Sequence, residues 1–305
     1  MTLIIEKGDC LKLMKELPDA SIDLFICDLP YVDINGNSET NCKWNQSAID
    51  MDKFWEQFRR LRKSKRTACI HFCSTKFGYS LIKSWEAGYK MDMVWKKRNK
   101  TGGLQSKHRP MRNHEMVYFF YEQSPKYNRD KYHKRIAAEP EHKTKNYETK
   151  SNEIHERTKA YMSGNKNLYE PRLPASVVEE TQGQKKAKDW GYEKCSKSFK
   201  NNEKVNGGRR MGANYEPPNP VSVMDEPVSM FESTKVFIGK RHHQTEKPQD
   251  ILEFFLKYWT DEGDTVLDPT MGSGSTGVAC KKLNRDFIGF EKDKNIFKVA
   301  ESRLK

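Results

Sequence analysis

The stretch DTVLDPTMGSGSTG, residues 264–277, lies near the carboxyl end of the chain and decides the fold. Its first four residues form a short run typical of a buried parallel strand, and the glycines after it predict a tight loop that opens a helix ending near Leu283. A further strand at 287–290 ends in Glu291. Strand, glycine loop, helix and strand in this order predict a nucleotide-binding βαβ unit, in which backbone N–H groups approach a ligand and the acidic residue binds ribose hydroxyls.

The glycines Gly272, Gly274 and Gly277 also satisfy the pattern GxGxxG, so a nicotinamide-dependent oxidoreductase has to be weighed. Chain order speaks against it, because a dinucleotide-binding fold begins with this unit and needs several more strands after it. Only 14 residues, 292–305, follow Glu291, which is enough for one helix. The other strands must come from the N-terminal part, so the predicted sheet is circularly permuted relative to the usual nucleotide-binding order.

The N-terminal part offers a matching strand, Ile22 to Cys27, which stops at the tetrapeptide DLPY, residues 28–31. Open α/β sheets bind their ligands at the carboxyl ends of parallel strands, so Asp28 and Tyr31 are expected beside the glycine loop. The carboxylate and a turn carbonyl can accept N–H bonds from a planar group that carries an amine. Tyr31 can stack on the face of that group.

Hydrophobic periodicity places the remaining elements. A first helix carries Leu11, Met14 and Leu17, and a hairpin with a basic, glycine-containing loop at 96–112 is expected over 89–121. Strands are predicted at 2–5, 68–73 and 235–238, and helices at 51–62, 76–87 and 251–259, the last begun by Pro248.

The positive charge of the chain is concentrated in one segment. Residues 53–130 carry 19 basic and 6 acidic side chains, a surplus that equals the net charge of +13 of the whole chain. Such a surface favours phosphate backbones. The DNA-contacting residues expected from this segment are Arg59, Arg60, Lys63, Lys100, Lys107, Arg109 and Arg112.

Residues 128–234 differ from the flanking parts of the chain. They are rich in Lys, Asn, Glu and Tyr with faint apolar periodicity, and the whole chain has only 35% hydrophobic residues and a mean hydropathy of -0.93. A segment of this kind inside a compact domain indicates an inserted module or a partly disordered one.

Cysteine usage and hydropathy indicate an intracellular protein. The seven cysteines form no CxxC pair, and no apolar run approaches the roughly 18 residues that span a bilayer. Cys69, His71 and Cys73 share one face of a predicted strand. Adjacent positions on one strand cannot surround a tetrahedral ion and no fourth ligand is evident, so no metal is expected.

Residues at both ends of the chain resemble the β-type amino-methyltransferases of DNA, which use S-adenosylmethionine (SAM). DLPY (28–31) is similar to the family's catalytic (D/N/S)-P-P-Y tetrapeptide, and DPTMGSG (268–274) is similar to its cofactor loop. HQTEKP (243–248) resembles the H-x-T-x-K-P stretch before that loop, and Trp95-Lys96-Lys97 with His114-Glu115 resembles the hairpin between the two motifs. The resemblance covers about 1–130 and 235–305, and motif order matches the β type, with a target-recognition insert in the middle.

The resemblance implies a role for each motif. Asp28 and the Leu29 carbonyl would accept hydrogen bonds from the target amino group, and Tyr31, after Pro30, would stack on a base flipped out of the duplex. Leu29 stands where the family usually has proline, so a looser turn with intact chemistry is expected. Glu291 would bind the cofactor ribose, the 270–276 loop its methionine portion and Asp9-Cys10 its adenine edge. The full set of expected cofactor residues is Asp9, Cys10, Asp28, Thr245, Lys247, Asp268, Pro269, Thr270, Gly272, Ser273, Gly274, Thr276 and Glu291.

The sequence therefore predicts an α/β, Rossmann-like methyltransferase sheet, circularly permuted, with an inserted target-recognition region. The expected division is 1–127 and 235–305 for the catalytic domain and 128–234 for the insert. The expected activity is transfer of a methyl group from SAM to N6 of adenine in double-stranded DNA, since an Asp at position 28 favours adenine. A cytosine-N4 enzyme, a nicotinamide oxidoreductase, an inactive DNA-binding relative and an RNA substrate stay open. So do a homodimer and a cognate restriction enzyme as partners, while a cytoplasmic location without a membrane is expected.

Overall fold

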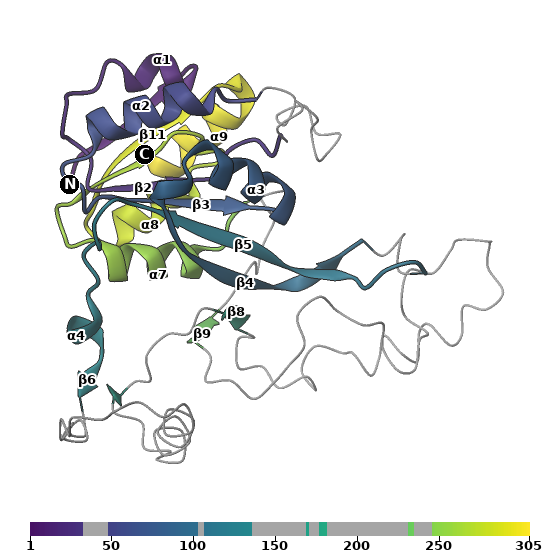
Figure 1. Cartoon of the computed structure of the whole chain (residues 1–305). Coiled ribbons are helices and arrows are strands. Elements are labelled where there is room, and N and C mark those ends of the chain that lie inside the picture. The colour runs from purple at the N-terminus through teal and green to yellow at the C-terminus, as the bar shows by residue number, and fades with distance from the viewer. Residues whose placement is uncertain (33–47, 103–106, 136–168, 171–176, 182–230, 235–245) are drawn as a thin grey trace, which may run out of the picture.

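A large twisted sheet runs through the protein and carries helices on both faces (Figure 1). The computed structural model describes residues 1–32, 48–102, 107–135, 169–170, 177–181, 231–234 and 246–305. The sheet has nine strands in the order β1-β11-β10-β2-β3-β5-β4-β8-β9. Their bounds are β1 (Leu3–Lys7), β2 (Leu24–Cys27), β3 (Ala68–Cys73), β4 (Tyr89–Thr101), β5 (Arg112–Phe120), β8 (Val177–Thr181), β9 (Phe231–Thr234), β10 (Thr265–Asp268) and β11 (Asp286–Glu291).

The strand order confirms the permuted sheet. β10, the strand before the glycine loop, lies between β11 and β2 and is parallel to both, with Val266 opposite Leu24. β1 pairs with β11 at the edge, so the two ends of the chain form neighbouring strands. In the sheet order, seven strands lie from β1 through to β4. Among these, only β5 is antiparallel to its neighbours, which are β3 and β4.

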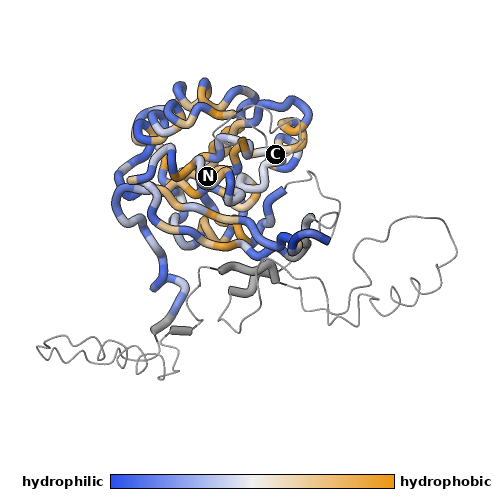
Figure 2. The backbone as a smooth tube through the Cα atoms, turned by 45° about the vertical axis from the view of Figure 1, so that its right-hand side comes forward, coloured by the Kyte–Doolittle hydropathy of each residue, from blue (hydrophilic) through white to orange (hydrophobic). Residues whose placement is uncertain are grey.

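Amphipathic helices cover the two faces because each buries one apolar stripe. One face is covered by α1 (Cys10–Met14), α2 (Met51–Leu61) and α3 (Thr75–Ser84), and the other by α7 (Gln249–Trp259), α8 (Ser275–Lys282) and α9 (Lys294–Leu304). In α2, for example, Phe54, Trp55, Phe58 and Leu61 are fully or almost fully buried. Figure 2 shows the hydrophobic residues gathered in the strands and hydrophilic ones along the outer turns. A short 3-10 helix, η2 (Glu86–Gly88), leads into β4.

Several predicted elements are confirmed, and their ends shift by a few residues. The strand at 68–73 and the hairpin within 89–121 are found as predicted. Ile22 makes only an isolated bridge to Arg62, so β2 begins two residues later than expected. The first helix ends at Met14, because the next N–H groups bond to carbonyls three residues back, and Pro248 is the N-cap of α7. The strand expected at 235–238 lies outside the described residues.

The start of the predicted insert packs against the end of α7. The Asn128 side-chain amide donates to the carbonyls of Lys257 and Thr260 at the end of α7, and His133 contacts Tyr258. The helix α4 (Arg129–Tyr132) lies between these two contacts, and β6 (Lys134–Arg135) pairs with β7 (Tyr169–Glu170). β8 and β9 extend the main sheet beyond β4. The division at 128 and 234 stays a prediction, since most residues between these positions are outside the described part.

No helix among the described residues is both long enough and apolar enough to cross a membrane.

Candidate active site

Asp28 begins the turn that follows β2, a strand whose four residues are all buried. The turn is closed by a hydrogen bond from the Val32 N–H to the Pro30 carbonyl of 2.9 Å. The Leu29 side chain is only 2% exposed and packs with the core on the α1–α3 face. Burial of Leu29 therefore anchors the turn at the position where the methyltransferases that this chain resembles usually have proline.

The Asp28 carboxylate has a partner on each oxygen. Tyr31 donates its hydroxyl to Oδ1 over 3.1 Å, and the Lys247 ammonium donates to Oδ2 over 2.6 Å. The Asp28 carbonyl accepts from the Thr270 hydroxyl at 3.1 Å, which joins the turn after β2 to the glycine loop after β10. The structure thus brings together the two predicted motifs, 242 residues apart in the chain.

Lys247 belongs to a chain of alternating charges that leads from Asp28 to the hairpin. Its Nζ is 3.8 Å from Oε2 of Glu115 on β5, and Oε1 of Glu115 accepts from Lys97 on β4 at 2.6 Å. Burial opposes the charge of Lys247, but Asp28 and Glu115 outweigh it and raise the pKa of Lys247. Burial likewise opposes ionisation of Glu115, but Lys247 and Lys97 lower its pKa. Lys247 and Glu115 therefore both keep their charge at neutral pH.

Tyr31 is held on one face by a second ring. It stacks on Phe77 of α3 with ring centroids 5.3 Å apart and an interplanar angle of 19°. Burial, followed by the nearby Asp28 carboxylate, raises the pKa of the Tyr31 hydroxyl. A neutral, oriented phenol ring beside Asp28 suits stacking on a flat ligand.

The glycine loop is pinned to the end of β10 by a buried carboxyl. Asp268 is 4% exposed and accepts from the Thr276 hydroxyl at 2.6 Å and the Thr270 N–H at 3.1 Å. Burial, together with the negative charges of Asp28 and Glu291, raises the pKa of Asp268 to about 7. Pro269 lies in the turn between these bonds.

Two glycines in the loop adopt left-handed backbone angles for different reasons. Gly272 has φ +53° and nothing within 4 Å of where a Cβ would lie, so it leaves open space above the loop. Gly274 has φ +79° and packs on Ala300 and Leu304 of α9. The Ser273 carbonyl and hydroxyl both accept from Arg303, whose guanidinium also pairs with Glu246 at 2.7 Å. The loop is therefore held against α9 through Ser273 and Gly274, while the space next to Gly272 is open.

Glu291 and Asp9 lie at adjacent strand ends on the same edge. The Gly8 N–H donates to the Glu291 carbonyl at 3.0 Å, and Asp9 caps α1 through the Leu11 N–H. Burial raises the pKa of the Glu291 carboxyl and raises that of the Cys10 thiol to about 11. Asp28, the glycine loop, Glu291 and Asp9-Cys10 thus follow one another along the carboxyl edge of the parallel strands. Thr245 lies outside the described residues.

The predicted DNA-contacting residues separate into two groups. Arg60 donates to the carbonyls of Met14 and Leu17, and Lys63 pairs with Asp23. Asp23 lies at the amino end of β2, five residues or roughly 17 Å along the strand direction from Asp28, and Arg59 stacks over Trp85. The structure therefore gives Arg59, Arg60 and Lys63 partners within the chain, away from Asp28, because α2 ends at the opposite edge of the sheet.

The other group lies on the hairpin. Arg112 begins β5 and its guanidinium is 3.5 Å from the Thr75 hydroxyl at the start of α3, on the same edge as Asp28. Lys107 and Arg109 are exposed near the hairpin end, and β4 and β5 extend well beyond the sheet there (Figure 1). The backbone of Lys100 is part of β4, and its side chain lies outside the described part.

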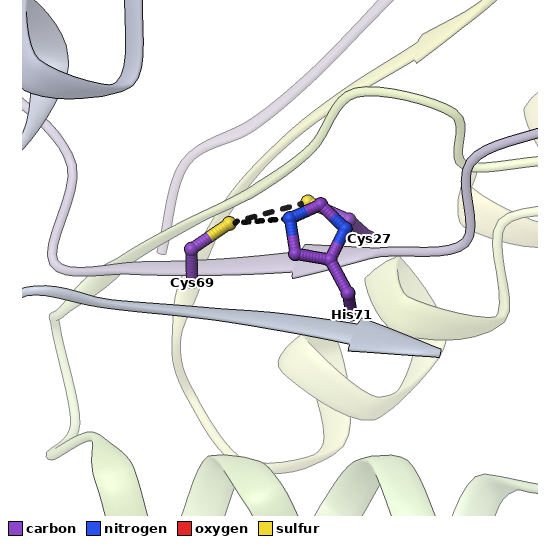
Figure 3. A group of neighbouring side chains, drawn as sticks. All are labelled: Cys27, Cys69 and His71. Atoms are coloured by element: carbon purple, nitrogen blue, oxygen red, sulfur yellow. Dashed lines mark hydrogen bonds between the residues drawn. The ribbon is translucent and has the colours of Figure 1, made fainter. Parts of the chain in front are cut away.

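A buried thiol–imidazole group lies beneath the β2 turn (Figure 3). The Cys27 and Cys69 sulfurs are 3.8 Å apart, and Cys69 Sγ is 3.2 Å from His71 Nε2. Burial opposes ionisation of Cys69, but Cys27 and His71 lower its pKa to about 6. The rings of Phe54, Trp55 and Phe120 surround the imidazole, and its Nδ1 has no hydrogen-bond partner among the described residues. A bound metal would need a further ligand and an acceptor for Nδ1, so we interpret the group as part of the core.

Glu115 is a site residue that sequence reasoning did not single out, although it noted the hairpin. Lys247 was expected to contact the cofactor, and in the structure its ammonium bonds to Asp28. The sequence gives one signal for the contacts of Lys247 with Asp28 and Glu115, namely that a buried charge needs an opposite charge. This signal does not identify which residues pair.

The sheet order and the two loops meeting at one edge define the class, an α/β sheet of the methyltransferase type with a permuted chain. A family model described as DNA methylase matches residues 22–302, nearly the whole chain. The chain therefore belongs to the DNA methylase family of N6 and N4 amino-methyltransferases.

Individual relatives match over short segments. The type II methyltransferase M2.DpnII of Streptococcus pneumoniae is 43% identical over 76 residues, which are 25% of this chain and 28% of the relative. The type II methyltransferase M.HindIII of Haemophilus influenzae is 43% identical over 65 residues, 21% of each. The chain thus spans less than a third of the length of these relatives.

Two solved structures share the fold. The PvuII DNA methyltransferase, described as cytosine-N4-specific, superposes with a TM-score of 0.57 at 15% identity, over 100% of this chain and 87% of that one. The M1.HpyAVI–SAM complex gives a TM-score of 0.50 at 19% identity, over 100% of both chains.

Proposed function

We propose that the protein transfers a methyl group from SAM to the N6 amino group of adenine in a specific sequence of double-stranded DNA. One observation carries the proposal: the Asp28 carbonyl bonds to Thr270 of the glycine loop, which sets an amine-binding carboxylate beside a nucleotide-binding loop. Membership of the DNA methylase family supports the same reaction class.

The residues at the strand ends fit SAM. The open space next to Gly272 admits a ligand close to the backbone, and the partly buried Glu291 carboxylate can accept the two ribose hydroxyls. We assign Thr270, Gly272 and Ser273 to the methionine portion and Asp9-Cys10 to the adenine edge. Asp268, Pro269, Gly274 and Thr276 shape the loop. When bound, SAM supplies a methyl group on a positively charged sulfur.

The DLPY turn would hold the target amine. One Asp28 oxygen and the Leu29 carbonyl accept its two N–H bonds, so its lone pair points away from both acceptors and toward the methyl group. Pro30 fixes the turn, and Tyr31, supported by Phe77, stacks on the base. A base inside a duplex cannot reach this turn, so the target must be flipped out. Asp at position 28 favours adenine over cytosine.

The hairpin would bind the DNA backbone. Lys107, Arg109 and Arg112 lie on the edge that carries Asp28, and Lys100 belongs to the same strand pair. Residues 128–234 are proposed as the target-recognition region between the catalytic segments 1–127 and 235–305. The relatives are named as type II methyltransferases, so a cognate restriction enzyme is a proposed partner.

The test is a transfer assay with tritiated SAM on mixed genomic DNA that carries no prior methylation, followed by digestion to nucleosides. Label in N6-methyladenine is expected. Label in N4-methylcytosine would show that the target base is cytosine and not adenine. Label in RNA alone would show that the substrate is RNA and not DNA. Tight SAM binding without label in either nucleic acid would indicate an inactive DNA-binding relative.

Asp28→Ala is expected to abolish transfer while leaving most SAM affinity, because the carboxylate serves the base. Gly272→Val is the matched variant, since its side chain fills the open space above the loop and should remove SAM binding. SAM affinity by calorimetry and label incorporation are measured for both. Equal loss of SAM binding in the two variants would contradict this division of roles.

A further inference from the structure

Lys247 lies between two carboxylates and is hydrogen-bonded to one of them. Its Nζ is 2.6 Å from Asp28 Oδ2 and 3.8 Å from Glu115 Oε2. Glu115 Oε2 is buried and has no hydrogen-bond partner among the described residues, whereas Oε1 is bonded to Lys97. A buried carboxylate oxygen without a hydrogen bond is costly, so this vacant acceptor needs an explanation.

The proposed reaction supplies one, and the inference rests on it. The amine nitrogen bonds to the methyl carbon as the carbon–sulfur bond breaks, with that electron pair remaining on sulfur. The nitrogen carries positive charge until it gives up a proton, and Asp28 is the carboxylate placed to stabilise that charge and accept the proton. An ammonium hydrogen-bonded to Asp28 opposes both roles.

We infer that Glu115 is a positioning residue that takes over the Lys247 ammonium when Asp28 binds the target amine. In the structure described, Lys247 neutralises Asp28. When the target amine binds, Lys247 Nζ moves by about 1 Å and forms a full hydrogen bond with Glu115 Oε2. Oδ2 of Asp28 is then free to accept a hydrogen bond from the amine. The four charges of Asp28, Lys247, Glu115 and Lys97 sum to zero, so the movement leaves no buried charge unpaired.

The hairpin fixes the second acceptor. Glu115 is opposite Trp95 in the β4–β5 register, and Lys97 is on the same strand as Trp95. Because the Lys97 bond holds Oε1, Oε2 is the oxygen that faces Lys247. The hairpin that carries the proposed DNA-binding residues therefore also holds a group that acts on Asp28.

The charged groups around Lys247 predict a distinct pH dependence. Asp28 faces it from the turn after β2, Glu115 from β5 and Asp268 from β10, with the Phe72 ring of β3 at 5.1 Å; Lys97 and Arg112 face Glu115. With Glu115 neutral, the other carboxyl that faces Lys247 is Asp268, whose oxygens are already bonded to Thr276 and Thr270, so the Lys247 charge leaves Asp28 only by deprotonation. Loss of Glu115 also removes one cause of the raised pKa of Lys247, so deprotonation occurs at lower pH.

The experiment is a double-mutant cycle on the full chain with Glu115→Gln, Lys247→Gln and the double variant. Single-turnover methylation is measured from pH 6.5 to 9.5, with KM values for SAM and DNA. Glu115→Gln should lower kcat by about 10- to 100-fold at pH 7 with little change in either KM, and its rate should rise with pH more steeply than that of the wild type. In the Lys247→Gln background, Glu115→Gln should have no further effect.

Two further variants separate this role from a structural one. Glu115→Asp keeps the charge and should restore most of kcat. Glu122→Gln, which removes a carboxylate paired with Arg62 at the opposite edge of the sheet, should leave kcat unchanged. Circular dichroism checks the fold of each variant.

Full activity of Glu115→Gln, or multiplicative losses in the double variant, would overturn the inference while the proposed function stands. Absence of transfer by the wild-type protein would overturn the proposed function and this inference with it.

Discussion

Asp268 lies where the glycine loop leaves β10, and its surroundings oppose its ionisation. Its pKa is about 7 in the folded chain against an ordinary value of 3.8. The folded state therefore binds this proton more tightly than the unfolded chain. The resulting stability is fully present below about pH 4 and is lost as pH rises through 7.

Asp268→Asn should remove this pH dependence, because the amide keeps the shape but cannot ionise. Between pH 5 and pH 8 the wild type should lose about 2–3 kcal/mol of unfolding free energy relative to the variant. Urea unfolding of both proteins without ligand at the two pH values measures the difference. An equal loss in wild type and variant would show that Asp268 ionises normally.

Sequence reasoning at the residue scale found side chains whose chemistry is set by a local motif. Asp28, Tyr31, Thr270 and Glu291 were all predicted at strand ends, and all lie on one edge of the sheet. Lys247 was predicted to contact the cofactor, but its ion pairs with Asp28 and Glu115 were not predicted, because these partners are 219 and 132 residues away from it in the chain. A buried ion pair is set by three-dimensional packing, which a local pattern does not contain.

At the scale of elements, the basic segment 53–130 contains two different surfaces. The residues at the end of α2 are bonded within the chain at the amino edge of the sheet, as shown by Arg60 and Lys63. The hairpin residues lie at the carboxyl edge. Counting charges along the sequence could not separate the two surfaces. A charge count gives the composition of a helix or a hairpin but does not show at which edge of the sheet it ends.

The hairpin should therefore carry the salt-dependent part of DNA binding. Lys107→Ala with Arg109→Ala should weaken binding to any duplex and reduce the slope of log affinity against log salt by roughly 2, because each residue is proposed to contact one phosphate. Lys65→Ala with Arg66→Ala removes two exposed basic residues at the amino edge and should change neither quantity. DNA affinity is measured for both double variants by fluorescence anisotropy at several salt concentrations. Equal effects of the two double variants would show that the hairpin is not the DNA-binding surface.

For the whole molecule, the permuted chain means that neither end folds around a complete sheet of its own. A permuted sheet was predicted from the sequence, and the parallel pairing of β10 with β2 confirms it. The sequence could not predict the contacts across the other face, where Phe255 of α7 meets Phe72 of β3 and Phe119 of β5 edge to face. Helix α7, from the C-terminal part of the chain, thus covers strands from the N-terminal half.

Because the two halves share one core, the described sheet and its helices should unfold as a single unit. Phe255→Ala should cost about 3–5 kcal/mol, as expected for a fully buried ring. Its urea transition should stay single, with an unchanged slope of free energy against urea concentration, and tryptophan fluorescence and far-ultraviolet circular dichroism should coincide. Phe297→Ala on α9, where the ring is only partly buried, is the matched control and should cost less. Two separate transitions, with only one moved by Phe255→Ala, would mean that the N-terminal strands form a stable unit without α7. That result would contradict a core built jointly by both ends of the chain.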